Sequence, residues 1–181
     1  MARVYFVKKA MKDNPAVKKG EPYYHWTPYR SSTRYSAKPP RPSQLCSGKK
    51  SEVMAAQETA GDALNEINFD KDTVVDDLTT IAQECADSFR ELGEQYRESK
   101  ENIPENLQEG EMAQNMEQMA DSLEEAASNL ESLDLEFNVE KEDYTEDGKL
   151  DQEAYDEACN NWMYEKRDDI QAEVDSVEIL F

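Results

Sequence analysis

Two stretches of the chain carry apolar residues at alternating steps of three and four positions. The first stripe consists of Val75, Leu78, Ala82, Cys85, Phe89, Leu92 and Tyr96. The second consists of Met112, Met116, Met119, Leu123, Ala126, Leu130 and Leu133. This spacing places each set along one face of a helix and is the heptad pattern of a coiled-coil seam. The pattern predicts two long amphipathic helices.

The residues between the two stripes favour a reversal of the chain. Pro104 disfavours helical geometry at the residue before it, and Gly110 is typical of a helix cap. A connection of this length lets the second helix fold back on the first. The sequence therefore predicts an antiparallel helical hairpin in which each seam buries the other.

Weaker apolar patterns predict a helix on each side of this hairpin. Residues 54–69 form the first, and Asp70 or Asp72 is a plausible N-cap for the long helix that follows. Residues 151–177 form the second, whose apolar face is expected to consist of Tyr155, Cys159, Trp162, Ile170, Val174 and Val177. Residues 135–144 alternate apolar and acidic positions, which suits either a strand or a linker.

Signals for β-strands occur near the N-terminus. Residues 3–7, 23–27 and 33–36 are rich in aromatic and β-branched side chains, and residues 30–32 favour a turn between the last two. Pro28 would confine its strand to an edge or a bulge. A two-stranded hairpin is marginal in water, so the strand at residues 3–7, the helices or a partner must support it.

These patterns predict a mainly α fold. It consists of a coiled-coil-like antiparallel helical hairpin and a C-terminal helix, preceded by a small β-hairpin module. The Lys38–Pro42 run KPPRP is expected to be extended, and residues 43–50 to be a flexible joint. The expected divisions are a basic β-rich module at 1–37, a Pro-rich basic linker at 38–50, an acidic helical hairpin at 51–135, a linker or short strand at 136–150, and a helix at 151–181.

Charge divides the chain near residue 50. Residues 1–50 hold 12 Lys or Arg against Asp13 and Glu21, whereas the remainder holds 8 Lys or Arg against 39 acidic residues. Cations interleaved with aromatic residues suit contact with nucleic acid, because cations neutralise phosphates and rings stack on unpaired bases. The candidate contacts are Lys8, Lys9, Lys18, Lys19, Tyr24, Trp26, Arg30, Arg34 and Arg41. Alternatively, the aromatics form the module's own core, or the basic arm docks on the acidic hairpin or an acidic protein.

The acidic half suggests two further roles. Residues 102–140 contain no Lys or Arg but many carboxylates, including Glu117, Asp121, Glu124 and Glu131. The first hypothesis is an interaction or adaptor protein, in which the hairpin presents an acidic helical surface to a protein partner and the N-terminal module binds nucleic acid or an acidic protein. Because a rod of carboxylates resembles a nucleic-acid backbone, the second hypothesis is a decoy for a host nucleic-acid-binding protein. Because heptads also pair between chains, a self-associating structural protein is the third hypothesis, and a homo-oligomer is possible.

Several kinds of chemistry lack the residues that they require. Residues 143–154 partly fit a calcium-binding loop, but Ala154 stands where the closing carboxylate is needed, and Asp151 suits a helix N-cap better. His25 is the one histidine, and the three cysteines are far apart, so no metal site or cofactor is expected. No catalytic motif is present, and we expect a non-enzyme. Without a long apolar segment or a secretory pattern, a cytoplasmic protein with no membrane contact is expected.

Three segments carry a resemblance to known sequences. They are KKAMKDNPAVKKGEPYYHW at residues 8–26, RYSAKPPRPSQL at 34–45 and IPENLQEGEMAQNMEQMADSLEEAASNLESLD at 103–134. Together they resemble a group of uncharacterised tailed-bacteriophage proteins with a basic β-hairpin, a proline-rich joint and an acidic helical region. This chain has TPYRSSTRYS where that group is expected to have a glycine-containing turn. The resemblance implies the cytoplasm of an infected bacterium but no established activity.

Overall fold

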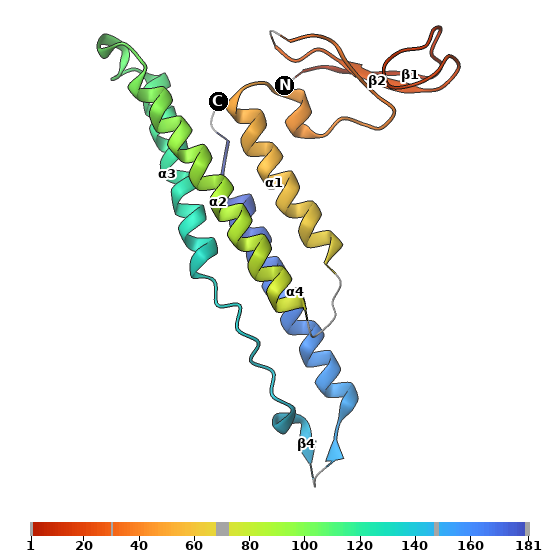
Figure 1. Ribbon diagram of the computed structural model, residues 1–181, viewed down its shortest axis with the longest axis vertical. Coiled ribbons are helices and arrows are strands. Elements are labelled where there is room, and N and C mark those ends of the chain that lie inside the picture. Colours follow the sequence, from red (N-terminus) through yellow and green to blue (C-terminus); the bar gives the residue numbers. More distant parts are fainter. Residues whose placement is uncertain (1, 30, 68–72, 147–148, 180–181) are drawn as a thin grey trace. The chain divides into compact units, whose positions relative to one another are not determined.

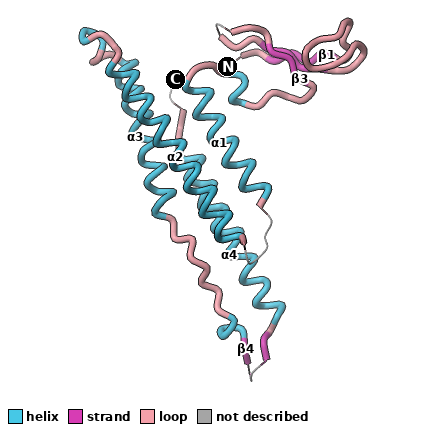
Figure 2. Tube along the Cα trace, in the orientation of Figure 1, coloured by secondary structure: helices cyan, strands magenta, loops and turns pink. Residues whose placement is uncertain are grey.

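Residues 2–29, 31–67, 73–146 and 149–179 are described by a computed structural model of the chain (Figure 1). The chain divides into an N-terminal unit, Met1–Ala55, and a helical unit, Ala56–Phe181. The division falls inside α1 (Lys49–Glu66) instead of in the linker expected at residues 38–50. Figure 2 shows that helices dominate, as the mainly α prediction requires, and that the main strands belong to the N-terminal unit.

A three-stranded antiparallel sheet forms the centre of the N-terminal unit. Its strands are β1 (Val4–Val7), β2 (Tyr23–Trp26) and β3 (Arg34–Ser36), in the order β1-β2-β3. The strand at the N-terminus therefore supports the predicted hairpin. The expectation that Pro28 confines its strand to an edge or a bulge is wrong, because the proline lies outside the strand: β2 is central and ends two residues before it.

The segment after the sheet is packed, and the expectation of a flexible joint at residues 43–50 is wrong. Residues Pro42–Leu45 form a 3-10 helix, η1, after which α1 begins at Lys49. The Trp26 indole donates a hydrogen bond to the Gln44 carbonyl at 2.7 Å, and the backbone N–H of Ala2 donates to the Leu45 carbonyl at 2.9 Å. A large ring on the central strand needs cover from water, and η1 supplies it.

The helical unit is built around α2 (Val74–Glu101) and α3 (Glu111–Ser132), which are connected through the 3-10 helix η2 (Glu105–Leu107). Ion pairs join Arg90 to Glu131 at 2.8 Å and Lys100 to Glu117 at 2.8 Å. Partner numbers fall along α3 as they rise along α2, so the two helices are antiparallel. This is the predicted helical hairpin.

The two helices bury most of the predicted seam positions. The buried members are Leu78, Ala82, Cys85, Phe89 and Leu92 on α2, and Met119, Leu123, Ala126 and Leu130 on α3. The seam ends differ from the prediction. Val74 is buried where Val75 was expected, and Met112 is 66% exposed while its neighbour Ala113 is buried.

Val75, Tyr96, Met116 and Leu133 are partly exposed. An α-helix drifts about 20° per heptad against a strict seven-residue repeat, so the buried face rotates toward the ends.

Small residues let α2 and α3 approach closely. Ala113, Ala120 and Ala127, spaced by seven positions, are all buried on α3. Opposite them, a Cβ atom added at Gly93 would lie 3.3 Å from the Ala120 carbonyl oxygen. The backbones therefore meet across this part of the seam without a large side chain between them.

The C-terminal helix α4 (Gln152–Ser176) begins where the sequence predicts, because the Asp151 carboxylate accepts a hydrogen bond from the Ala154 N–H at 3.1 Å. At its other end, the Gln57 side chain of α1 donates to the carbonyls of Val174 and Val177. These bonds join the helical part of α1 that follows residue 55 to the end of α4.

The first half of α4 packs against an extended segment, residues 133–140, and the 3-10 helix η3 (Lys141–Tyr144). Phe137 lies edge-on to Trp162 with ring centroids 5.1 Å apart, and Tyr144 packs on Tyr155. Residues 135–144 contain no strand. A short hairpin of β4 (Thr145–Glu146) and β5 (Lys149–Leu150) follows.

The N-cap residue of α2 is Thr73, and the predicted caps Asp70 and Asp72 lie outside the described residues, as does Phe69. Among the helices that the structure describes, none combines the length and apolar character that a bilayer span requires.

Candidate nucleic-acid interface

One face of the N-terminal sheet carries a cluster of aromatic rings. The strand register sets Tyr5 of β1 opposite His25 of β2, and His25 opposite Tyr35 of β3. The Tyr5 and His25 rings stack with centroids 5.1 Å apart and planes at 14°, and the Tyr35 centroid lies 6.3 Å from that of His25. Tyr23 completes the cluster at 5.9 Å from His25 and 6.0 Å from Tyr35. We call Tyr5, Tyr23, His25 and Tyr35 the aromatic row.

The aromatic row is open to solvent at both edge strands. Tyr5 is 47% exposed and Tyr35 is 40% exposed, while Tyr23 and His25 between them are half-buried. Burying this much aromatic surface is favourable, so a fold that leaves it in water has a surface suited to a flat, apolar ligand.

The other face of the sheet has a different character because side chains alternate along a strand. Trp26 on this face is only 2% exposed and is held by its hydrogen bond to Gln44. Phe6 packs on Tyr24 with centroids 4.9 Å apart, and its own ring is 53% exposed. One face of the sheet is thus partly buried, at Trp26, and the other face carries the aromatic row.

One cation, Arg3, borders the aromatic row at β1, and further exposed cations lie nearby in the sequence. The guanidinium carbon of Arg3 lies 5.3 Å from the centroid of the Tyr5 ring. Lys8 and Lys9 follow β1 directly and are exposed. Arg34 of β3 is also exposed, but it pairs with Trp26 and therefore lies on the opposite face of the sheet. Cations next to aromatic faces are the combination that tracks a phosphate backbone while bases stack.

The two carboxylates of the first fifty residues accept hydrogen bonds within the loop between β1 and β2. Asp13 accepts a hydrogen bond from the backbone N–H of Lys19 at 2.7 Å, and Glu21 accepts one from the N–H of Lys18 at 2.9 Å. No Asp or Glu occurs between residues 22 and 51. The charge carried by the sheet and the segment that follows it is therefore predominantly cationic.

The predicted nucleic-acid contacts divide into three groups in the structure. Lys8, Lys9, Lys18, Lys19, Arg34 and Arg41 are exposed. Trp26 is buried, so the prediction that it stacks on bases is corrected to a structural role, and Tyr24 shares its face of the sheet. Arg30 lies outside the described residues.

The sequence reasoning missed Arg3 and the aromatic row as a cluster. The signal that finds them is the two-residue period of a strand, which places Tyr23 and His25 on the face opposite Tyr24 and Trp26.

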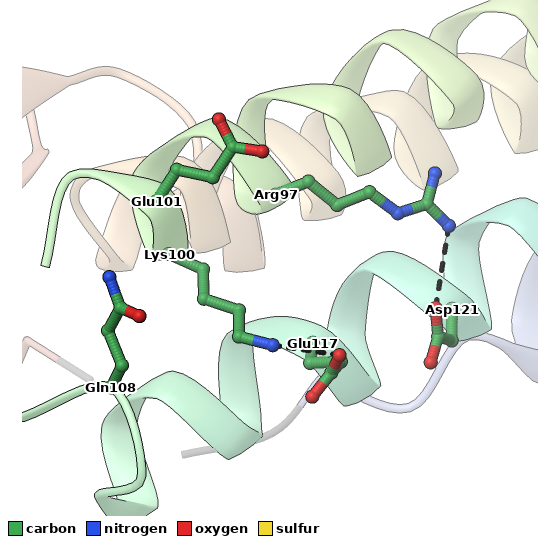
Figure 3. A pocket seen from close by; sticks show the side chains of 6 residues that line it. All are labelled: Arg97, Lys100, Glu101, Gln108, Glu117 and Asp121. Carbon is green, nitrogen blue, oxygen red and sulfur yellow. Dashed lines mark hydrogen bonds and ion pairs between the residues drawn. The ribbon is translucent and has the colours of Figure 1, made fainter. Parts of the chain in front are cut away.

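A surface pocket of about 420 Å³ lies near the tip of the α2–α3 hairpin (Figure 3). Its lining residues are Arg97, Lys100, Glu101, Gln108, Glu117 and Asp121. Its two cations are engaged by carboxylates across the hairpin, with Arg97 3.4 Å from Asp121 and Lys100 2.8 Å from Glu117. The pocket is bracketed by ion pairs that link two helices, so both of its cations are already engaged by carboxylates.

Other candidate chemistry finds little support among the described residues. They contain no group of three or more His, Cys, Asp or Glu arranged to hold a metal ion. In the partial calcium loop, Asp147 and Gly148 lie outside the described residues, and Asp151 is used as the helix cap. Burial raises the pKa of the Cys85 thiol to about 12, which keeps it protonated and unreactive at neutral pH.

Comparison with known proteins found no matching family model, no similar curated protein and no similar solved structure. The resemblance to tailed-bacteriophage proteins therefore stays a prediction from the sequence.

Proposed function

We propose that this chain is a non-enzymatic binding protein whose N-terminal unit binds nucleic acid. The observation that carries the proposal is the aromatic row, with Arg3 over its Tyr5 ring, on a unit that has many exposed cations and few carboxylates. The N-terminal unit holds 12 Lys or Arg against three acidic residues. Cationic side chains that displace condensed counterions from phosphates supply most of the affinity in such contacts. The helical unit, in which acidic residues dominate, would then be the part available to a protein partner, as in an adaptor.

The alternative of an acidic decoy is less well supported. A decoy must present its carboxylates to another protein, and four of those on α3, Glu117, Asp121, Glu124 and Glu131, are partly neutralised by ion pairs with cations of α2. Self-association through the seams is also less well supported, because α2 and α3 bury most of each other's seam within one chain.

Titration of the full chain into a labelled oligonucleotide, followed by fluorescence anisotropy, tests the proposal. Binding is expected at low salt. The logarithm of the association constant should fall linearly with the logarithm of the salt concentration. The double variant Lys8→Gln/Lys9→Gln should lower the magnitude of that slope by about 1.4 for a single strand, since each phosphate contact contributes about 0.7.

A matched control removes two exposed cations from the helical unit. Lys141→Gln/Lys149→Gln changes the net charge equally but should leave the slope unchanged if the contacts lie in the N-terminal unit. Absence of binding to both DNA and RNA at low salt would contradict the proposed function.

A further inference from the structure

We infer that the ligand of the N-terminal unit is single-stranded nucleic acid, and that its unpaired bases stack on the aromatic row. This inference rests on the proposed function and narrows it to one class of ligand and one face of the sheet. The cations alone would attract any polyanion. The rings favour those polyanions that have exposed flat bases, because only such bases can stack on them.

The arrangement of the rings favours base stacking. Tyr5 and His25 stack with centroids 5.1 Å apart and planes at 14°, while Tyr23 and Tyr35 are inclined to His25 by 36° and 35°, so the row consists of one stacked pair flanked by two tilted rings. Tyr35 ends the row on an edge strand and is 40% exposed, which leaves a ring on which a base can stack. At the opposite end, Arg3 lies over Tyr5 and can meet the phosphate or stack on a base.

A duplex cannot use this surface in the same way. Its bases are covered by the pairs above and below, so a protein meets only their edges in the grooves. Unpaired bases expose both faces and stack on tyrosine and histidine without regard to sequence. The aromatic row should therefore bind single strands of different sequences with similar affinity and bind duplexes mainly through charge.

Substitution of two neighbouring residues on β1 can show which face of the sheet binds the nucleic acid. Tyr5 and Phe6 are exposed to a similar extent, at 47% and 53%, but they point to opposite faces of the sheet. Tyr5→Ala removes a ring from the row, whereas Phe6→Ala removes an equally exposed ring from the other face. The pair is a matched test of stacking at a defined surface.

The experiment measures the binding of the full chain to a single-stranded oligothymidylate of about 15 nucleotides, its RNA counterpart, and a duplex of the same length, at moderate salt. The single strands should bind at least about tenfold more tightly than the duplex. Tyr5→Ala and Tyr35→Ala should weaken single-strand binding about 5- to 100-fold, the range for loss of one stacked base. Tyr35→Phe and Phe6→Ala should stay within about threefold of the parent chain.

Ultraviolet cross-linking of oligothymidylate to the unsubstituted chain locates the contact without any substitution. Cross-links at Tyr5, Tyr23 or Tyr35 would support the inference, and cross-links confined to the helical unit or to Phe6 would overturn it. Equal affinity for duplex and single strand, unaffected by ring removal but weakened by Lys8→Gln/Lys9→Gln, would also overturn it while leaving the proposed function standing. Absence of binding to every oligonucleotide at low salt would overturn both.

Discussion

Replacing Trp26 with phenylalanine separates a structural role for this residue from a role in stacking. The indole N–H donates to the Gln44 carbonyl at 2.7 Å in a position where the side chain is 2% exposed. Phenylalanine keeps a ring but lacks the donor, so the carbonyl oxygen loses its partner. Loss of a net hydrogen bond and the cost of an unsatisfied acceptor should together destabilise the N-terminal unit by about 1–3 kcal/mol.

The same substitution at Trp162 is a matched control. This indole is also buried, at 6% exposure, but its Nε1 has no hydrogen-bond partner among the described residues. Trp162→Phe and Trp26→Phe remove the same atoms from buried positions. The difference between their effects therefore isolates the hydrogen bond to Gln44.

Hydrogen exchange measured by mass spectrometry reports the stability of each unit in the full chain. A loss of about 1–3 kcal/mol corresponds to about 5- to 100-fold faster exchange of the β1 and β2 amides in Trp26→Phe. Exchange in α4 of Trp162→Phe should change less. Equal effects of the two substitutions, or unchanged exchange in the sheet, would refute the structural role.

Three further predictions concern the helical unit. The hydrogen bond from Arg90 lowers the pKa of the Glu131 carboxyl. A lowered carboxyl pKa stabilises the fold at pH values above the pKa of the unfolded state, near 4.3, and this stabilisation is lost as the pH falls. In urea unfolding between pH 6 and pH 3, the free energy of unfolding of Glu131→Gln should therefore fall less with acid than that of the parent chain. Cys85 should react slowly with a disulfide reagent at pH 8 in the native chain and rapidly in urea, whereas fast native reaction would contradict its burial and raised pKa. Met119→Gln should cost about 2 kcal/mol or more in urea unfolding because the side chain is buried, and exposed Met112→Gln should cost less than about 0.5 kcal/mol; equal costs would contradict the seam.

The heptad spacing predicts the helical hairpin because burial in a helix pair follows a short, regular period. It predicts the middle of the seam better than its ends, where Met112 is exposed and Val74 replaces Val75. A straight α-helix drifts about 20° per heptad against a strict seven-residue repeat, so the buried face leaves the heptad positions toward the ends of the seam.

The candidate site was less accessible to prediction. Composition identifies the basic aromatic region, but it cannot distinguish Trp26, which is buried, from Tyr5 and Tyr35, which are exposed. That distinction depends on which face η1 covers, and this cover comes from residues about 18 positions away through the bond to Gln44. The alternating pattern of residues 135–144 does not decide between a strand and a linker, because a pattern of this length suits both. Their packing on the first half of α4 appears only in the structure.

The bonds from Gln57 to the carbonyls of Val174 and Val177 have a consequence for the order of folding. They connect residues 117 and 120 positions apart, whereas the α2–α3 ion pair of Lys100 and Glu117 closes a loop of 17 positions. Short loops close with a smaller entropy loss and earlier than long ones. During synthesis the α2–α3 hairpin can therefore form first, and α1 acquires its contacts with α4 only after the last turn of α4 has been made.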